Sequence, residues 1–191
     1  MERYKTYSGH LKQIYGEKVY KLPVNLPVTC PNRMDGEGCS FCGGVGTGFE
    51  AMNCETSVSE QLLTTKEKIA KRYKAKKFIA YFQNYTNTFL PVKQLEEYMI
   101  EAARMEDIVG ISISRPDCIT RDYLDCMKNV SDTYGVKISI EYGLQTVNYK
   151  TLEKINRGHS LAEYLDAVLM TAPYGFEICT HIILNLPGDD M

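Results

Sequence analysis

Three cysteines lie within thirteen residues of this chain, at Cys30, Cys39 and Cys42. Thiolates are strong ligands for iron–sulfur clusters and for zinc, and the CxxC spacing of Cys39 and Cys42 lets one tight turn present both sulfurs to the same group. Gly36 and Gly38 lie in the eight residues before Cys39, where they let the backbone curl and bring Cys30 alongside. The spacing therefore predicts a metal site in this loop.

The number of cysteines favours an iron–sulfur cluster over zinc. A structural zinc site takes four protein ligands, whereas a cubane [4Fe–4S] cluster held by three cysteines leaves one iron open to an outside ligand. Cys54 is a candidate fourth ligand, which keeps a zinc site or a closed cluster as an alternative. Buried cysteines without a metal are the plainer alternative. We interpret Cys30, Cys39 and Cys42 as the ligands of a [4Fe–4S] cluster.

The composition is that of an ordinary globular protein in a reducing compartment. The 191 residues are 44% apolar and 24% charged, and the formal charge of −2 does not favour a polyanion-binding protein by net charge. The first twenty residues lack the apolar run of a signal peptide, and no stretch approaches the ~20 apolar residues that cross a bilayer. Seven cysteines without a secretory signal indicate a cytoplasmic protein with no membrane partner.

Short apolar runs alternate with longer amphipathic runs along the whole sequence. Strands are predicted at residues 24–29, 78–83, 109–114, 136–142 and 176–186, and helices at 56–73, 91–105, 121–132 and 161–172. Thr56 or Ser57, with Glu60 near capping-box spacing, marks the start of the first helix, and Gly135 marks the end of the third. Helices that separate successive strands indicate an α/β fold with parallel strands.

The number of strand–helix units predicts an open or partial (βα) barrel. A closed eight-unit barrel needs ~250 residues, whereas this sequence provides five strands in one domain over residues 1–191, with residues 1–22 as an N-terminal extension. The sequence stops directly after the fifth strand. We therefore expect the C-terminal part of the barrel to lie outside these residues.

The sequence of the cysteine loop and of the residues around it resembles that of a known family. The three-cysteine loop after the first strand, with Phe41 just before Cys42, resembles the signature of radical SAM enzymes, with a longer gap between the first two cysteines than is usual. The stretches KLPVNLPVTCPNR and GCSFC are similar to the YhcC-like bacterial group, which is related to the catalytic subunit of Elongator. The resemblance extends from about residue 3 to residue 188.

The resemblance implies where S-adenosylmethionine (SAM) binds. Polar groups after the second strand would hold the methionyl amino group, and those after the third would contact the ribose or carboxylate. The E-x-G-x-Q segment of the fourth strand would line the SAM site, and the backbone of the fifth would pair with the adenine edge. The residues concerned are Gln83, Tyr85, Thr86, Ser112, Ser114, Arg115, Glu141, Gln145 and Ile183. Because function in βα barrels gathers at the C-terminal face of the sheet, we expect these segments to converge.

The resemblance also implies a reaction and partners. A reduced cluster would cleave SAM to methionine and a 5′-deoxyadenosyl radical that acts on an unidentified substrate, for which a tRNA is one candidate. Flavodoxin or ferredoxin would be the reductant, and the resemblance assigns no catalytic side chain. The basic stretch at residues 66–77 would then follow RNA phosphates, but a solvated helix face explains the same residues. Two other classes stay open: an iron–sulfur maturation or electron-transfer protein without a small-molecule substrate, and a zinc-structured binding module.

Overall fold

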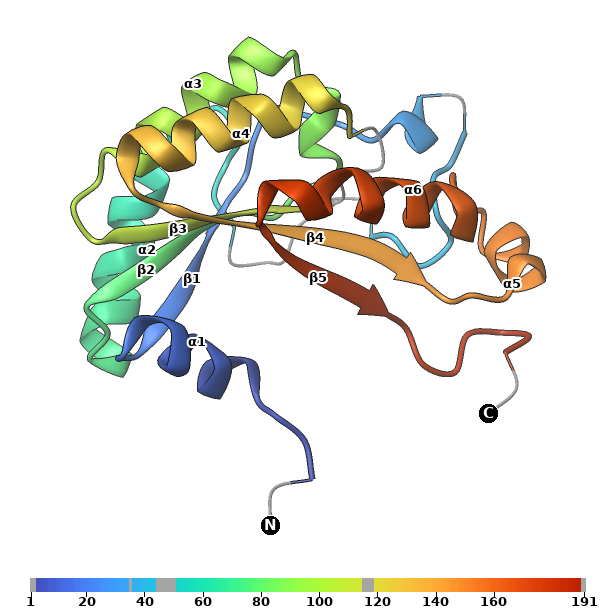
Figure 1. The fold of residues 1–191 in the computed structure, drawn as a ribbon, viewed down its shortest axis with the longest axis horizontal. Helices are drawn as coiled ribbons and strands as arrows, with labels where there is room; N and C mark the ends of the chain where they lie inside the picture. Colours follow the sequence, from blue (N-terminus) through green and yellow to red (C-terminus); the bar gives the residue numbers. More distant parts are fainter. Residues whose placement is uncertain (1–2, 35, 44–50, 115–118, 190–191) are drawn as a thin grey trace.

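The computed structural model describes residues 3–34, 36–43, 51–114 and 119–189, and in these ranges it forms one wholly parallel sheet in the order β1-β2-β3-β4-β5. Each strand pairs with its neighbour in the sequence, as in a βα barrel that is left open (Figure 1). This confirms the prediction of an α/β partial barrel. The strands are β1 (Val19–Val24), β2 (Lys77–Phe82), β3 (Ile108–Ser114), β4 (Lys137–Gln145) and β5 (Glu177–Ile182).

Helices cover the two faces of the sheet unequally. In Figure 1, α3, α4 and α6 lie on one side of the sheet and α1 lies on the other. The helices are α1 (Tyr7–Tyr15), α2 (Val58–Tyr73), α3 (Val92–Ala103), α4 (Arg121–Tyr134), α5 (Tyr149–Lys154) and α6 (Leu161–Thr171), with short 3-10 turns at Pro31–Arg33, Asn87–Phe89 and Ala172–Tyr174. Among the described residues, no helix is both long and apolar enough to cross a bilayer.

The side chains of the strands alternate between an apolar face and a polar face. On the apolar face, Phe82, Ile113 and Ile140 have no exposed surface and pack with residues of α2, α3 and α4 into the main core. The alternate positions carry polar side chains, among them Ser112 and Glu141, which hydrogen-bond to each other. Because successive strand residues point to opposite faces, the same strands build both the core and the lining of a polar site.

The first strand lies earlier than the sequence predicted. β1 ends at Val24, where residues 24–29 were expected to form the strand. Leu26 is buried, but the side chain of Asn84, not a neighbouring strand, satisfies its backbone: Asn84 Oδ1 accepts from the Leu26 N–H at 2.9 Å, and Asn84 Nδ2 donates to the Leu26 carbonyl at 2.5 Å. Pro23 lies in β1 because an edge strand tolerates a missing N–H.

The other elements agree closely with the sequence. Ser57 caps α2 by accepting from the Glu60 N–H at 3.3 Å, and Gly135 ends α4 in a left-handed conformation with φ of 69°. β4 continues beyond the predicted residue 142 to Gln145, and β5 ends at Ile182 instead of residue 186. The helices α1 and α5 were not predicted, and both are short.

The bond between Asn84 and Leu26 gives a stability prediction. We expect Asn84→Ala to lower the free energy of unfolding by about 1–3 kcal/mol, because it leaves the buried N–H of Leu26 without a partner, whereas the Leu26 carbonyl keeps the hydrogen bond from the Val28 N–H at 2.8 Å. Urea unfolding followed by circular dichroism measures the change. The matched control is Asn53→Ala at an exposed position, for which we expect a change within about 0.5 kcal/mol. Equal losses in the two variants would contradict the role of Asn84.

Candidate functional site

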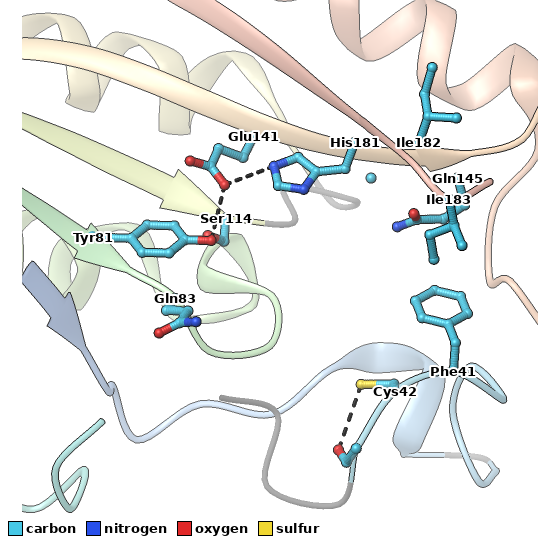
Figure 2. Close-up of a pocket in the computed structure, with 12 residues that line it drawn as sticks. Phe41, Cys42, Tyr81, Gln83, Ser114, Glu141, Gln145, His181, Ile182 and Ile183 are labelled. Carbon is cyan, nitrogen blue, oxygen red and sulfur yellow. Dashed lines mark hydrogen bonds and ion pairs between the residues drawn. The ribbon is translucent and has the colours of Figure 1, made fainter. Parts of the chain in front are cut away.

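A cavity of about 360 Å³ opens at the C-terminal ends of the strands. Its walls come from the ends of β2 to β5 on one side and from the cysteine loop on the other, with Cys42 across the cavity from Glu141 (Figure 2). The lining residues are Phe41, Cys42, Gly43, Tyr81, Gln83, Ser114, Glu141, Gly143, Gln145, His181, Ile182 and Ile183. The face at which the SAM segments were expected to converge is therefore hollow.

The cavity receives some of the predicted SAM contacts and not others. Five of them line it: Gln83, Ser114, Glu141, Gln145 and Ile183. Three others, Tyr85, Thr86 and Ser112, lie nearby but are not among the lining residues. Arg115 lies outside the described residues. The ends of β2, β3, β4 and β5 thus meet at one place.

The floor of the cavity is built around Glu141, a carboxylate with only 3% of its surface exposed. Its Oε1 forms an ion pair with Lys21 and accepts from Ser112 Oγ at 2.8 Å. Its Oε2 accepts from Tyr81 OH at 3.0 Å and from His181 Nε2 at 2.9 Å (Figure 2). Both oxygens of this buried carboxylate are therefore bonded to side chains of the other four strands.

These contacts fix the charges of the floor. Burial alone would raise the pKa of Glu141, but the hydrogen bond from His181 and the charge of Lys21 outweigh it and lower that pKa to about 2. Contacts with Cys179 and with Glu141 raise the pKa of His181 to about 9, against the opposing effect of burial. At neutral pH an ionised carboxylate thus lies between two cations, and the three groups together carry one positive charge.

Two polar groups of the cavity have no partner within the part of the chain that the structure describes. They are the side-chain carbonyl oxygen of Gln83 and the hydroxyl of Ser114, and both are buried. The backbone N–H of Ser114 donates to Asn87 Oδ1 at 2.8 Å, which holds the end of β3 in place. A buried polar group without a partner costs about 1–3 kcal/mol, so both groups are suited to bind a polar ligand.

The wall of the cavity around Gly143 and Ile183 combines closely packed backbone with apolar side chains. A Cβ on Gly143 would lie 2.7 Å from Gln145 Nε2, so a larger residue here would have to displace the end of the Gln145 side chain. The Ile183 N–H donates to the Gln145 carbonyl at 3.0 Å. Phe41 and Ile183 both pack against a small apolar cluster and lie close together at this wall (Figure 2). This wall is suited to a flat apolar group such as a purine ring.

The cysteine loop presents sulfurs that accept hydrogen bonds. Thr86 Oγ1 donates to Cys30 Sγ at 3.4 Å, and Cys39 Sγ accepts from Asn32 Nδ2 at 3.4 Å and from Arg157 Nη1 at 3.5 Å. Such donors stabilise negatively charged sulfur, which fits thiolate ligands. Among the described residues, no group of three or more His, Cys, Asp or Glu side chains is gathered around a metal position. The assignment of the three cysteines as cluster ligands therefore stays a prediction. The hydrogen-bond donors around the sulfurs are consistent with it.

Sequence reasoning missed several side chains that shape the site. Lys21 is a charged residue inside a strand, at an alternate position to the buried Leu22, and this pattern could have identified it. Arg157 and Asn32 reach Cys39 from 118 and 7 residues away. His159 Nε2 also donates to the Gly143 carbonyl at 3.0 Å. Only the tertiary fold brings Arg157 and His159 to this wall.

Comparison with known proteins gives consistent matches. Residues 24–191 match the Radical SAM superfamily. The chain is 38% identical to the uncharacterized protein YtqA of Bacillus subtilis and 37% identical to protein YhcC of Escherichia coli K12, covering 99% and 96% of the chain. The chain spans about three fifths of the length of these relatives, 59% in each case.

A solved structure with the same fold is the archaeal Elp3 of Methanocaldococcus infernus, which carries an N-terminal deletion. It superposes with a TM-score of 0.62 at 17% identity, over 90% of this chain and 39% of that one. At this level of identity the likeness concerns the fold alone. It agrees with the partial barrel described above.

The shifted pKa values predict how pH acts on stability. The lowered pKa of Glu141 stabilises the fold above pH 4.5, and this contribution is lost as the pH falls from 4.5 towards 2. The raised pKa of His181 stabilises the fold below pH 6.5, and this contribution is lost as the pH rises from 6.5 to about 9. The floor therefore contributes most between pH 4.5 and 6.5.

Glu141→Gln tests this coupling. The neutral amide removes the negative charge that favours the protonated imidazole but leaves the contact with Cys179, so we expect the pKa of His181 to fall below about 9, in the direction of its ordinary value of 6.5. Imidazole resonances followed by NMR against pH measure the midpoint. The matched control is Glu177→Gln, whose carboxylate contacts His10 at 2.6 Å instead. A His181 midpoint that stays near 9 in Glu141→Gln would show that Glu141 does not hold the proton there.

Proposed function

The chain belongs to the radical SAM superfamily, and from this membership we propose that it is an enzyme that binds a [4Fe–4S] cluster through Cys30, Cys39 and Cys42 and SAM beside it. The observation that carries the proposal is the cavity at the strand ends. It has Cys42 in one wall and, in the other, buried polar groups of Gln83 and Ser114 that have no partner among the residues the structure describes.

The residues around the cysteines fit a cluster. Thr86, Asn32 and Arg157 already donate to two of the three sulfurs, and the six cysteines in the described part of the chain are free thiols. Free thiols fit a cytoplasmic location, which is part of the proposal. When bound, a reduced cluster supplies one electron to the sulfonium of SAM, which yields methionine and a 5′-deoxyadenosyl radical that abstracts hydrogen from a substrate.

The residues of the cavity fit SAM. A volume of about 360 Å³ lies within the range of small-molecule sites. Gln83 and Ser114 would bind the amino and carboxylate groups, Gln145 the ribose, and the wall of Phe41 and Ile183 the adenine. The surplus positive charge of the floor favours ligand oxygens there. Glu141, whose oxygens are already bonded to side chains of the other four strands, acts as the buried counterion that holds this floor.

The substrate is proposed less specifically than the cofactors. A tRNA base is the substrate class, and flavodoxin or ferredoxin the reductant, that the resemblance to the YhcC-like group and to Elongator suggests. The basic stretch at residues 66–77 does not add support. This stretch leads from α2 into the N-terminal end of β2, whereas the cavity lies at the C-terminal ends of the strands. RNA would have to reach the cavity over other residues.

Cluster loading separates the proposed enzyme from the other two classes. We expect Cys30→Ala, Cys39→Ala and Cys42→Ala each to abolish cluster binding, because each removes one ligand of three, while Cys54→Ala, the matched control, binds the full amount. Anaerobic reconstitution with iron and sulfide, followed by iron analysis and visible absorbance, measures the loading. Loss of the cluster in Cys54→Ala alone would contradict the ligand assignment.

The reconstituted protein is then reduced with dithionite in the presence of SAM. The enzyme proposal expects 5′-deoxyadenosine, measured by liquid chromatography. A loaded cluster that does not cleave SAM would instead favour an electron-transfer or maturation protein. A colourless protein that retains one zinc through purification would contradict the cluster altogether.

Ser114→Ala tests whether the unsatisfied hydroxyl serves the ligand. We expect SAM to bind about tenfold more weakly to the reconstituted variant, because one hydrogen bond worth about 1.4 kcal/mol is lost. The apo-protein should be at least as stable as the wild type, because the hydroxyl has no partner among the described residues. Isothermal titration calorimetry and urea unfolding measure the two effects.

Thr88→Ala is the matched control for this variant. Thr88 also has a buried hydroxyl without a partner among the described residues, but it does not line the cavity. Its loss should leave SAM binding unchanged. Unaltered SAM affinity in Ser114→Ala, or an equal loss in both variants, would count against the placement of SAM at the end of β3.

A further inference from the structure

Residues 155–159, which follow α5, are docked on the cysteine loop by backbone and side-chain hydrogen bonds. The Ser40 N–H donates to the Ile155 carbonyl at 2.9 Å, and Asn156 Nδ2 donates to the Gly38 carbonyl at 2.8 Å. In return, Asn32 Nδ2 donates to the Asn156 carbonyl at 2.7 Å. The cysteine loop is therefore attached to a segment more than a hundred residues further along the chain.

Arg157 lies at the centre of this attachment. Only 9% of its surface is exposed, and its Nη1 donates to Cys39 Sγ at 3.5 Å. Its Nε and Nη2 donate to the Gly143 carbonyl at 3.2 and 2.8 Å. A Cβ on Gly143 would come within 3.0 Å of Nη2, so the absence of a side chain there makes room for the guanidinium. The guanidinium thus joins the wall of the cavity to a cysteine sulfur.

A second arginine in the loop provides a comparison. Arg33 Nη2 donates to the carbonyls of Cys42 and Gly43 at 2.9 and 3.0 Å, and its guanidinium lies 5.5 Å from the ring centre of Tyr85. Arg33 is more exposed than Arg157, so water screens its charge more strongly. Of these two guanidinium groups, Arg157 holds the less screened positive charge beside a sulfur.

We propose that Arg157 is a positioning residue that holds Cys39 and raises the reduction potential of the cluster. The inference rests on the proposed function, because it requires a cluster on the three cysteines. Reduction adds one electron from an external reductant and therefore one negative charge, with no bond made or broken in the protein. A buried cation hydrogen-bonded to a ligand sulfur stabilises that added charge, since hydrogen bonds to sulfur and local charge set cluster potentials.

Arg157→Gln removes the charge and keeps a polar side chain. We expect the variant, reconstituted anaerobically as the full chain without SAM, to bind as much iron as the wild type but to be harder to reduce. The equilibrium constant for one-electron reduction should fall at least tenfold, which is about 59 mV for a one-electron couple. Redox titration followed by electron paramagnetic resonance measures the midpoint. Arg157→Lys keeps the charge but not the planar set of guanidinium N–H donors, so its midpoint should lie between those of the wild type and Arg157→Gln.

Arg104→Gln is the matched control, because it removes the same charge from an exposed position at the C-terminal end of α3. Its midpoint should equal that of the wild type. A loaded Arg157→Gln with the wild-type midpoint, or a shift equally large in Arg104→Gln, would overturn the proposal. A wild-type protein that binds no cluster would instead overturn the proposed function, so the two failures are distinguishable.

A variant that loads poorly is also decisive. If Arg157→Gln binds too little iron for titration, Arg157→Lys takes its place. A midpoint more negative than that of the wild type then supports the role of the guanidinium hydrogen bonds in raising the reduction potential. A loaded Arg157→Lys whose midpoint is unchanged or more positive overturns it. Failure of both variants to bind iron also overturns the tuning role, because Arg157 would then serve the assembly of the loop alone.

Discussion

A buried carboxylate on the polar face of the sheet is the interaction on which the rest of the site depends. An ionised group out of contact with water is tolerated only when it is paired and hydrogen-bonded. Glu141 on β4 meets this requirement with one side chain from each of the other four strands, namely Lys21, Tyr81, Ser112 and His181. A slip of one residue in any strand would turn its donor to the opposite face, so the network favours the register of the whole sheet.

The same strand connects this floor to the cysteine loop. Beyond Glu141, β4 continues to Gly143, whose carbonyl accepts from Arg157 and His159, and Arg157 reaches Cys39. The position of the cysteine sulfur relative to the cavity is thus set by a chain of contacts that begins at the buried carboxylate. Fixed charges and donors arranged before a ligand arrives need little reorganisation when it binds.

Much of the fold could be predicted from the sequence because local patterns decided it. Short apolar runs identified the strands around Phe82 and Ile140, and local hydrogen bonding determined the ends of helices at Ser57 and Gly135. The first strand was misplaced because Leu26 is buried by packing and by the side chain of Asn84 and not by strand pairing. A run of apolar residues in the sequence does not distinguish these two causes of burial.

The site was predictable only where it follows from strand ends. Polar residues at the ends of parallel strands meet at one edge, so the sequence could place Gln83, Ser114 and Gln145 at the cavity that they line, whereas Arg157 depends on a tertiary contact across 118 residues. The groups of Gln83 and Ser114 that have no partner in the described part of the chain also bear on the class of protein. Each costs about 1–3 kcal/mol, and a zinc-structured module would gain nothing from keeping them beside a hollow. Their position opposite Cys42 is what a protein that binds a polar ligand beside its cysteines requires.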